Sequence, residues 1–156
     1  MTDPPREHRR GEFTSSTDRS RLDVTAIHAF LSTSYWAHGI PLEVVRRSID
    51  HSLCFGVYAA ERQVGFARVI TDQATFAYLA DVYILEEYRG RGLARWLLEC
   101  ILGHPALQGL RRFTLVTRDA HELYRKLGFT EVAEPSAYME IRVPDPYCRE
   151  QRKESR

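Results

Sequence analysis

The sequence lacks several features that would identify other classes of protein. Its three cysteines, Cys54, Cys100 and Cys148, are odd in number and have no CxxC spacing, which argues against a disulfide framework and against a zinc site. No apolar run reaches the roughly 18 residues that a membrane-spanning helix needs. The start, MTDPPREHRRGE, is polar and lacks the apolar segment of a signal peptide. We therefore expect a cytoplasmic protein with reduced thiols, no bound metal and no membrane partner.

An excess of charge of either sign is also missing. The chain has 22 basic and 21 acidic side chains, a formal net charge of +1. General nucleic-acid binding depends on clustered phosphate contacts, so this balance argues against a nucleic-acid partner. With 44% apolar residues, the 156 residues suffice for one domain with a buried core. We predict a single domain over residues 11–145, between disordered tails at residues 1–10 and 146–156.

Between these tails, segments with helical and strand patterns alternate. Residues 22–34 have apolar side chains at helical spacing, and Pro41 suits the start of a second helix, LEVVRRSID. Three β-rich runs with short polar turns follow, LCFGVYAA, QVGFARVIT and ATFAYLADVYIL, and they indicate an antiparallel meander. The chain then reads as helix, strand, helix and two short strands, at residues 92–102, 112–117, 119–127, 130–133 and 138–143.

This order, with one further strand ahead of the first helix pair, predicts an α+β (mixed α/β) fold. A meander that leads into a β-α-β crossover makes a mixed, mostly antiparallel sheet, and we expect helices on both of its faces.

The stretch EEYRGRGLARWLL places Gly90 and Gly92 between a strand and a helix. The free N–H groups and the dipole at a helix start favour an anion, and glycine lets the backbone approach a phosphate at positive φ. Arg89 and Arg91 could add charged contacts, so a pyrophosphate is the natural ligand. The dinucleotide motif G-x-G-x-x-G fails, because Arg95 occupies the place of the third glycine, and the nucleotide P-loop is absent.

What remains, Arg89-x-x-Gly92-x-Ala94, resembles the acyl-CoA loop of the GNAT superfamily of N-acetyltransferases. About thirty residues downstream, LYRKLGF resembles the second signature of that family, and the predicted element order is similar from the first helix pair to the last strand. The resemblance implies the GNAT fold with acetyl-CoA as co-substrate. It also implies acetyl transfer to a primary amine of a small molecule or peptide, by direct attack in a ternary complex.

The resemblance also implies roles for individual residues. The pyrophosphate would be held by the loop, with backbone N–H groups from Arg91 to Ala94. A backbone N–H within residues 82–84 would polarise the thioester oxygen, and Thr117 stands where many members have an asparagine that holds pantetheine. Tyr124 matches the general acid. The implied donor-site residues are Val82, Tyr83, Ile84, Arg89, Gly90, Arg91, Gly92, Leu93, Ala94 and Thr117.

The general base is left open by the sequence. Asp81 lies in an otherwise apolar strand, where burying a carboxylate is costly unless it is paired or has a function. It would act as a catalytic base or hold the substrate ammonium, or it would be a buried acid paired with an arginine such as Arg68. Glu86, Glu87, His38 and His121 are the other candidates.

The acceptor is also left open. The loop with Tyr35, Trp36 and His38 would line an amine pocket, unless Tyr35 and Trp36 belong to the core. A non-catalytic acyl-CoA-binding regulatory module of the same fold is the alternative function. Reading YRGRG as an RNA contact is disfavoured by the charge balance. The sequence leaves the oligomeric state open, and the resemblance implies a homodimer as one candidate, because many relatives are dimers.

Overall fold

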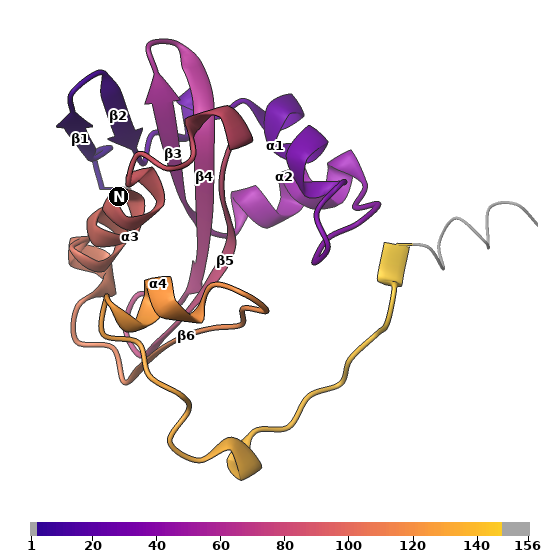
Figure 1. The fold of residues 1–156 in the computed structure, drawn as a ribbon. Helices are drawn as coiled ribbons and strands as arrows, with labels where there is room; N and C mark the ends of the chain where they lie inside the picture. Colours follow the sequence, from indigo (N-terminus) through magenta and orange to yellow (C-terminus); the bar gives the residue numbers. More distant parts are fainter. Residues whose placement is uncertain (1–2, 148–156) are drawn as a thin grey trace, which may run out of the picture.

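The computed structural model of the protein describes residues 3–147 and has one mixed sheet with helices on both faces (Figure 1). The six strands lie in the order of the chain: β1 Glu7–Arg10, β2 Phe13–Ser16, β3 Leu53–Ala59, β4 Arg62–Thr71, β5 Phe76–Ile84 and β6 Arg112–Leu115. The helices are α1 Val24–Leu31, α2 Leu42–Asp50, α3 Leu93–Leu102 and α4 His121–Arg125. Strands β1 to β5 pair antiparallel, whereas β6 is parallel to β5.

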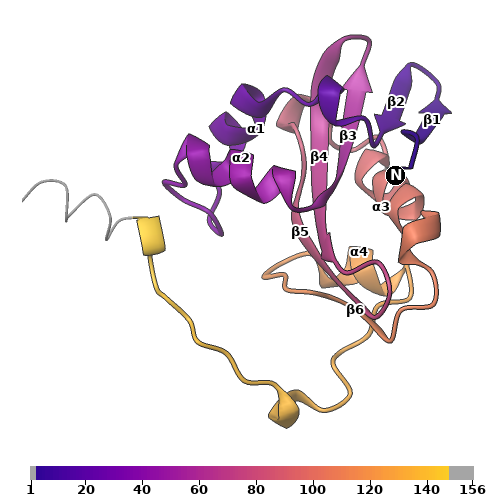
Figure 2. The same ribbon diagram turned by 180° about the vertical axis from the view of Figure 1, so that it is seen from behind.

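Helices α1 and α2 cover one face of the sheet, while α3 and α4 cover the other (Figures 1 and 2). Each face has its own apolar cluster. One includes Leu97 and Tyr124, and the other includes Ile27 and Val45. The predicted α+β architecture, a mostly antiparallel mixed sheet between two layers of helices, is therefore confirmed. No helix in residues 3–147 has the length and apolar content that crossing a membrane requires.

The first helix pair starts where the sequence allows. Helix α1 begins after Asp23, whose side chain accepts a hydrogen bond from the N–H of Ala26 and so satisfies one of the free donors at the helix start. Pro41 directly precedes α2, which buries Val45 and Ile49. The loop between these helices carries Tyr35 and Trp36.

The predicted element order is wrong at both ends. Residues 7–10 were expected in a disordered tail but form β1, which pairs with β2. All four residues of its sequence EHRR are exposed and none is apolar, which suits an edge strand. The segment therefore lacks the alternation of apolar and polar residues that identifies a strand. The domain therefore begins earlier than residue 11.

At the other end, the two short strands expected at residues 130–133 and 138–143 are not formed. Within the described chain, residues 130–145 are exposed and contain only a short turn of helix at Pro135–Ala137. The segment leaves the sheet and pairs with no strand of the described residues (Figure 1). The prediction of a disordered tail from residue 146 is wrong at its start, because Tyr147 packs against the α1–α2 cluster. Residues 148–156 lie outside the described part.

Strand β5 is irregular, and this irregularity positions the site. Its pairing with β4 shifts register between Phe66 and Arg68, opposite Asp81, whose φ is 56°. Its pairing with β6 runs only from Phe76 to Leu79. Beyond Leu79 the two parallel strands diverge, so the edge of β5 that faces β6 is open from residue 80 to residue 84.

Candidate active site

The start of α3 offers unpaired backbone donors. Gly92 is its N-cap with φ 76°, no side chain caps the helix, and the first helical hydrogen bond runs from the N–H of Trp96 to the carbonyl of Gly92. The N–H groups of the first turn after Gly92 therefore have no acceptor within the helix. Gly90 also has positive φ, 79°, which an L side chain rarely adopts. A cavity of about 180 Å³ adjoins this turn and is lined by Gly90, Gly92 and Ala94, among others.

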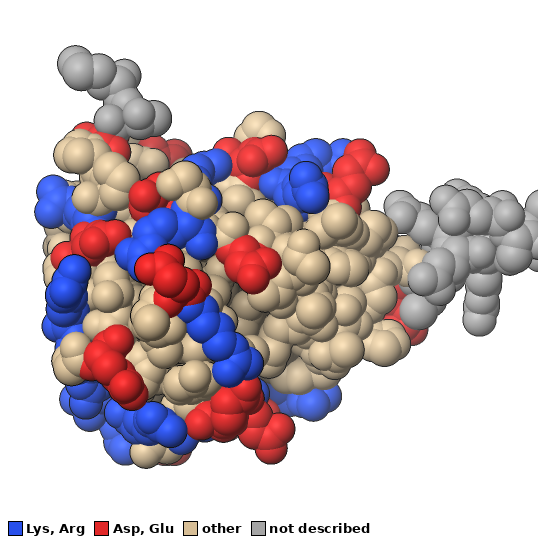
Figure 3. All heavy atoms as spheres, turned by 90° about the horizontal axis from the view of Figure 1, so that it is seen from above, with Lys and Arg blue, Asp and Glu red and all other residues tan. Residues whose placement is uncertain are grey.

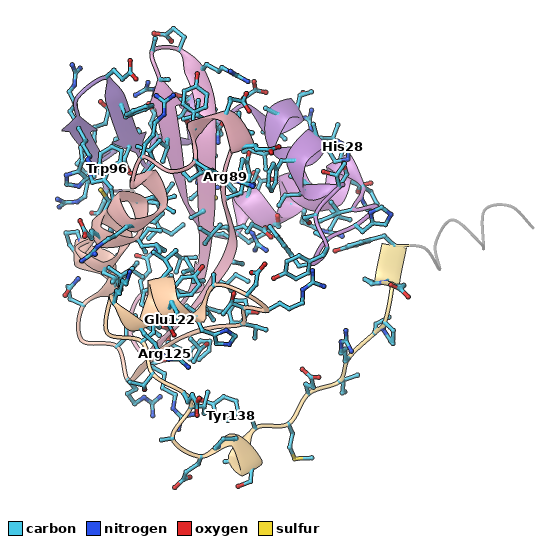
Figure 4. The ribbon with its side chains drawn as sticks, in the orientation of Figure 1. His28, Arg89, Trp96, Glu122, Arg125 and Tyr138 are labelled. Carbon is cyan, nitrogen blue, oxygen red and sulfur yellow. The ribbon has the colours of Figure 1, made fainter. Side chains whose placement is uncertain are left out.

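The arginines around this turn mostly form contacts within the protein that hold the loop in place. Arg89 donates from Nε to the carbonyl oxygen of Ile84 at 3.0 Å, which ties the loop to the end of β5 (Figure 4). Arg91 lies 3.7 Å from a carboxylate oxygen of Glu12, and both side chains are half exposed. Charges of both signs intermingle on the end of the molecule seen in Figure 3. An anion at this turn would therefore be held by backbone donors more than by a cluster of free cations.

Sequence reasoning missed Arg10, a further residue at this turn. Arg10 lies at the end of β1 and donates from Nη1 to the carbonyl oxygen of Gly92 at 3.0 Å. A Cβ atom on Gly92 would lie 3.3 Å from the same nitrogen. Because residues 1–10 were expected to be disordered, no sequence signal placed Arg10 next to a loop more than eighty residues away.

The strand residues expected near the thioester lie beside the opening between β5 and β6. Val82 is half-buried, and Tyr83 and Ile84 are buried. The ring of Tyr83 stacks on Phe30 of α1 at 3.8 Å between centroids, so its side chain belongs to the core and only its backbone can face a ligand. Burial raises the pKa of the Tyr83 phenol well above its usual value, which keeps it neutral.

Tyr124 lies on α4 and is 9% exposed. Its ring contacts Phe129 edge-on at 5.8 Å, and no other group of residues 3–147 hydrogen-bonds its hydroxyl. Burial raises the pKa of Tyr124 to about 12, and the nearby Tyr35 and Asp119 act in the same direction. The phenol is therefore protonated throughout the neutral range and is available as a donor.

A groove of about 980 Å³ runs along β6 and α4, and Tyr124, Thr117 and His121 are among its lining residues. The Thr117 hydroxyl accepts a hydrogen bond from the N–H of Ala120 at 3.1 Å, which leaves its proton free to be donated. Leu123, also on α4, lines the smaller cavity beside Gly92. Helix α4 therefore borders both the cavity at the Gly92 turn, through Leu123, and the groove, through Tyr124.

Asp81 is paired on both oxygens. Arg68 donates from Nε to Oδ2 at 2.8 Å, and the indole N–H of Trp36 donates to Oδ1 at 2.9 Å. The Arg68 and Asp81 side chains are only 15% and 9% exposed, and Arg68 also donates to Ser52. This is the arrangement that the alternative of a buried, arginine-paired acid predicted. A carboxylate held in this way is poorly placed to take a proton from a substrate.

The loop between α1 and α2 presents aromatic side chains to solvent. Tyr35 and Trp36 are 49% and 42% exposed, which disfavours the alternative that they are core residues. They contact each other edge-on at 5.1 Å, and His38 is exposed on the same loop. Sequence reasoning missed Arg118, whose guanidinium lies 3.9 Å from the centroid of the Tyr35 ring. This contact joins the loop to the β6–α4 connection.

The other proton-acceptor candidates are scattered. Glu87 pairs with Arg62 at 2.8 Å, and its pKa is lowered mainly by a hydrogen bond from its own backbone and then by Arg62. Glu86 is exposed beside it. His121 lines the groove with Tyr124, whereas His38 lies on the other loop. Within the described residues, no three His, Cys, Asp or Glu side chains are grouped so that they could hold a metal ion.

Comparison with known proteins identifies the family. Residues 50–131 match the acetyltransferase (GNAT) domain, and this span includes the loop at Gly92 and Tyr124. The chain belongs to the GNAT acetyltransferase family. It is therefore an N-acetyltransferase that uses acetyl-CoA.

Relatives of this GNAT domain cover most of its length. A candidate acetyltransferase from Gibberella zeae is 38% identical over 83% of this chain and 86% of its own. The crystal structure of a candidate GNAT acetyltransferase from Xanthomonas campestris pv. campestris is 54% identical, with a TM-score of 0.85 over 86% of this chain and 96% of that one. A candidate acetyltransferase from Clostridium acetobutylicum, solved with acetyl-CoA, shares the fold at 14% identity, with a TM-score of 0.60 over 89% of this chain and 95% of that one.

Proposed function

We propose that this GNAT domain transfers the acetyl group of acetyl-CoA to a primary amine of a small molecule or peptide, by direct attack in a ternary complex. The observation that carries the proposal is the position of α4 between two cavities. Leu123 borders the turn with the free N–H groups of α3, and Tyr124 lines the groove. A donor whose pyrophosphate lies at that turn can therefore direct its thioester along the open edge of β5 towards the Tyr124 hydroxyl.

The turn from Gly90 to Ala94 would bind the pyrophosphate through backbone N–H groups, with the helix dipole adding to the attraction. Arg89 and Arg10 support this role indirectly, since both donate to backbone carbonyls that fix the turn. A backbone N–H of residues 82–84 on the open edge of β5 would polarise the thioester oxygen. A donor placed at a developing oxyanion contributes about 3–4 kcal/mol to lowering the barrier.

In the reaction, the amine nitrogen attacks the thioester carbon, the carbon–sulfur bond breaks and the sulfur leaves as a thiolate. Tyr124 would donate its phenolic proton to this sulfur. With the pKa of Tyr124 raised to about 12, complete transfer to a thiolate, whose thiol has a pKa of about 8.5, is unfavourable by about 5 kcal/mol. The transfer goes to completion only if the phenolate regains a proton. The attacking nitrogen loses a proton as the amide forms, and this proton restores the phenol.

The acceptor would lie against Tyr35, Trp36 and His38. The exposed indole of Trp36 can hold an apolar or cationic body through burial or cation–π contact. Because the carboxylate of Asp81 fixes the indole N–H, we assign Asp81 to positioning Trp36 rather than to proton transfer. His121 lines the groove with Tyr124 and is the candidate base that the geometry supports best.

A panel of amino acids, polyamines, arylalkylamines and peptides tests the proposal. We expect amine-dependent release of free CoA thiol, with an acetylated amine identified by mass spectrometry. Varying both substrates should give intersecting double-reciprocal lines, whereas parallel lines would indicate a covalent acetyl-enzyme instead of direct attack. Acetyl-CoA binding without turnover across the panel would favour the alternative, a regulatory module that binds acyl-CoA.

A further inference from the structure

Arg118 lies in the connection between β6 and α4, next to the aromatic loop between α1 and α2. The Thr117 hydroxyl accepts a hydrogen bond from the N–H of Ala120 at 3.1 Å, which closes a turn that contains Arg118. Figures 1 and 2 both show this connection extending from the start of α4 towards the α1–α2 loop. The Arg118 guanidinium lies over the Tyr35 ring, 3.9 Å from its centroid. The turn and the ring together fix the position of this cation.

The Arg118 guanidinium has unused hydrogen-bond donors. Within residues 3–147 it forms no hydrogen bond and no ion pair, not even with its neighbour Asp119. The cation–π contact with Tyr35 consumes none of its N–H groups, so they stay available to a ligand. The fork of N–H groups on a guanidinium matches the two oxygens of a carboxylate. A guanidinium that is already held in place loses less side-chain entropy on binding such a group.

The charges beside the aromatic loop favour a negatively charged ligand. Within residues 3–147, Arg118 and Asp81 are the two charged side chains that form a cation–π contact or a hydrogen bond with Tyr35 or Trp36. The carboxylate of Asp81 is paired with Arg68 at 2.8 Å, whereas Arg118 is unpaired. The Tyr35 ring already has a cation over it, so it does not need one from the substrate. A further positive charge on the substrate would be repelled by Arg118, and a negative charge would be attracted.

Tyr35 relates this cation to the proposed reaction centre. Its ring contacts Arg118, and its hydroxyl acts on Tyr124, because Tyr35 follows burial among the causes that raise the pKa of Tyr124. An electrostatic effect of this kind requires the two phenols to be near each other. A carboxylate bound to Arg118 and a thioester beside Tyr124 would therefore lie on two sides of one side chain. A molecule of the size of an amino acid can bridge that span.

We propose that the acceptor is a free amino acid, whose carboxylate is bound by Arg118 and whose side chain lies against Trp36. This inference rests on the proposed function, since it specifies the amine of that reaction. One guanidinium balances one negative charge, which fits a carboxylate better than a phosphate with nearly two.

Held in this way, the amino acid presents its α-amino nitrogen to the thioester carbon beside Tyr124. The nitrogen forms a bond to the acetyl carbon, the carbon–sulfur bond breaks, and the proton that the nitrogen loses is balanced by the one that the sulfur gains. The products are an N-acetyl amino acid and the free CoA thiol. Arg118 is then a specificity-determining residue and takes no part in proton transfer.

Turnover of the common amino acids, each compared with its α-amide, tests this assignment, because the amide lacks only the negative charge. We expect the wild-type chain to acetylate at least one amino acid with a kcat/KM roughly 10- to 100-fold above that of its amide, the usual effect of a hydrogen bond to a charged group. Arg118→Gln should abolish this preference by lowering kcat/KM for the amino acid alone. Arg118→Lys keeps the charge but not the fork, so it should retain part of the preference. Comparing each variant with the wild type cancels the difference in basicity between the two amines.

Arg111→Gln is the matched control. It removes the same charge from an exposed arginine at the opposite end of β6, whose side chain has no hydrogen bond or ion pair within residues 3–147, and it should leave the preference unchanged. Calorimetric titration of the CoA complex with N-acetyl amino acids and their amides measures the carboxylate site without turnover.

The outcomes separate this inference from the proposed function. Binding of an N-acetyl amino acid that Arg118→Gln weakens, with no turnover of any amine, would support the carboxylate site and contradict acetyl transfer. Amides acetylated as efficiently as amino acids, or acetylation of peptides or polyamines alone, would overturn the inference and leave acetyl transfer standing. Equal losses for amino acid and amide in Arg118→Gln would also overturn it, because Arg118 would then only hold Tyr35. So would the absence of both binding and turnover for every amino acid.

Discussion

Replacing Gly92 with alanine perturbs, in two ways, the turn that we propose to bind the pyrophosphate. The N-cap φ of 76° is a conformation that costs an L residue about 1–2 kcal/mol. The added Cβ would also lie 3.3 Å from Arg10 Nη1, so the guanidinium that bonds the Gly92 carbonyl must shift. If the alanine variant relaxes to negative φ, the first N–H groups of α3 no longer converge. Each 1.4 kcal/mol is about tenfold in affinity, so a cost of about 1–2 kcal/mol predicts that acetyl-CoA binds about 5- to 30-fold more weakly.

Two measurements on three glycine variants separate these effects. Calorimetric titration gives the affinity for acetyl-CoA, and urea unfolding gives the free energy of unfolding. Gly109→Ala introduces the same kind of strain at φ 72°, with open space around the Cβ, in the loop before β6. It should lose about 1–2 kcal/mol of unfolding free energy and bind acetyl-CoA normally. Gly90→Ala, at φ 79° with open space, places the strain in the turn without the Arg10 contact.

We expect the loss of acetyl-CoA affinity to be largest for Gly92→Ala, smaller for Gly90→Ala and absent for Gly109→Ala. In an Arg10→Ala background, the Gly92→Ala and Gly90→Ala losses should become similar, because the guanidinium no longer meets the new Cβ. Normal acetyl-CoA binding by Gly92→Ala, with a stability loss equal to that of Gly109→Ala, would refute the role of this turn.

Three further predictions concern buried polar side chains. Tyr124→Phe should lower kcat by roughly 10²- to 10⁴-fold, the usual contribution of a general acid, with little change in acetyl-CoA affinity; equal losses in kinetics and calorimetry would contradict this. Tyr58→Phe should raise the free energy of unfolding by up to about 1–3 kcal/mol, because the Tyr58 hydroxyl is the one fully buried side-chain polar atom in residues 3–147 without a hydrogen-bond partner. A lower free energy of unfolding in urea would contradict this. Asp81→Asn should lower that free energy by about 1–3 kcal/mol, because the largely buried Arg68 loses its charged partner. Lost activity at full stability would instead assign Asp81 to proton transfer.

The central part of the fold could be predicted because local pattern and tertiary structure agree there. The β3–β5 meander has apolar runs separated by short polar turns, and the glycine-rich turn before α3 has the residues that positive φ requires. Strand β1 could not be predicted, since the pairing with β2 decides its conformation and its own side chains are all polar or charged. The alternating pattern at residues 138–143 predicted a strand, but a strand also needs a pairing partner, and these residues pair with no strand of the described chain.

The candidate site likewise contains residues that the sequence identifies and residues that only the structure brings to the site. Gly92 and Tyr124 belong to local motifs that the sequence displays in full. Arg10 and Arg118 contribute through contacts with distant segments, and no spacing along the chain signals such contacts. For Asp81 the sequence offered two alternatives, and only the positions of the Arg68 and Trp36 side chains favour one of them.

The most direct test of acetyl transfer with Tyr124 as the proton donor compares amine-dependent CoA release by the wild-type chain and by Tyr124→Phe, side by side over the amine panel. At least one amine should be acetylated by the wild type. Tyr124→Phe should retain acetyl-CoA binding but lose most of that turnover. Equal turnover by the two proteins, with the same amine and at every pH, would contradict the assignment of Tyr124 as the proton donor to the leaving thiolate.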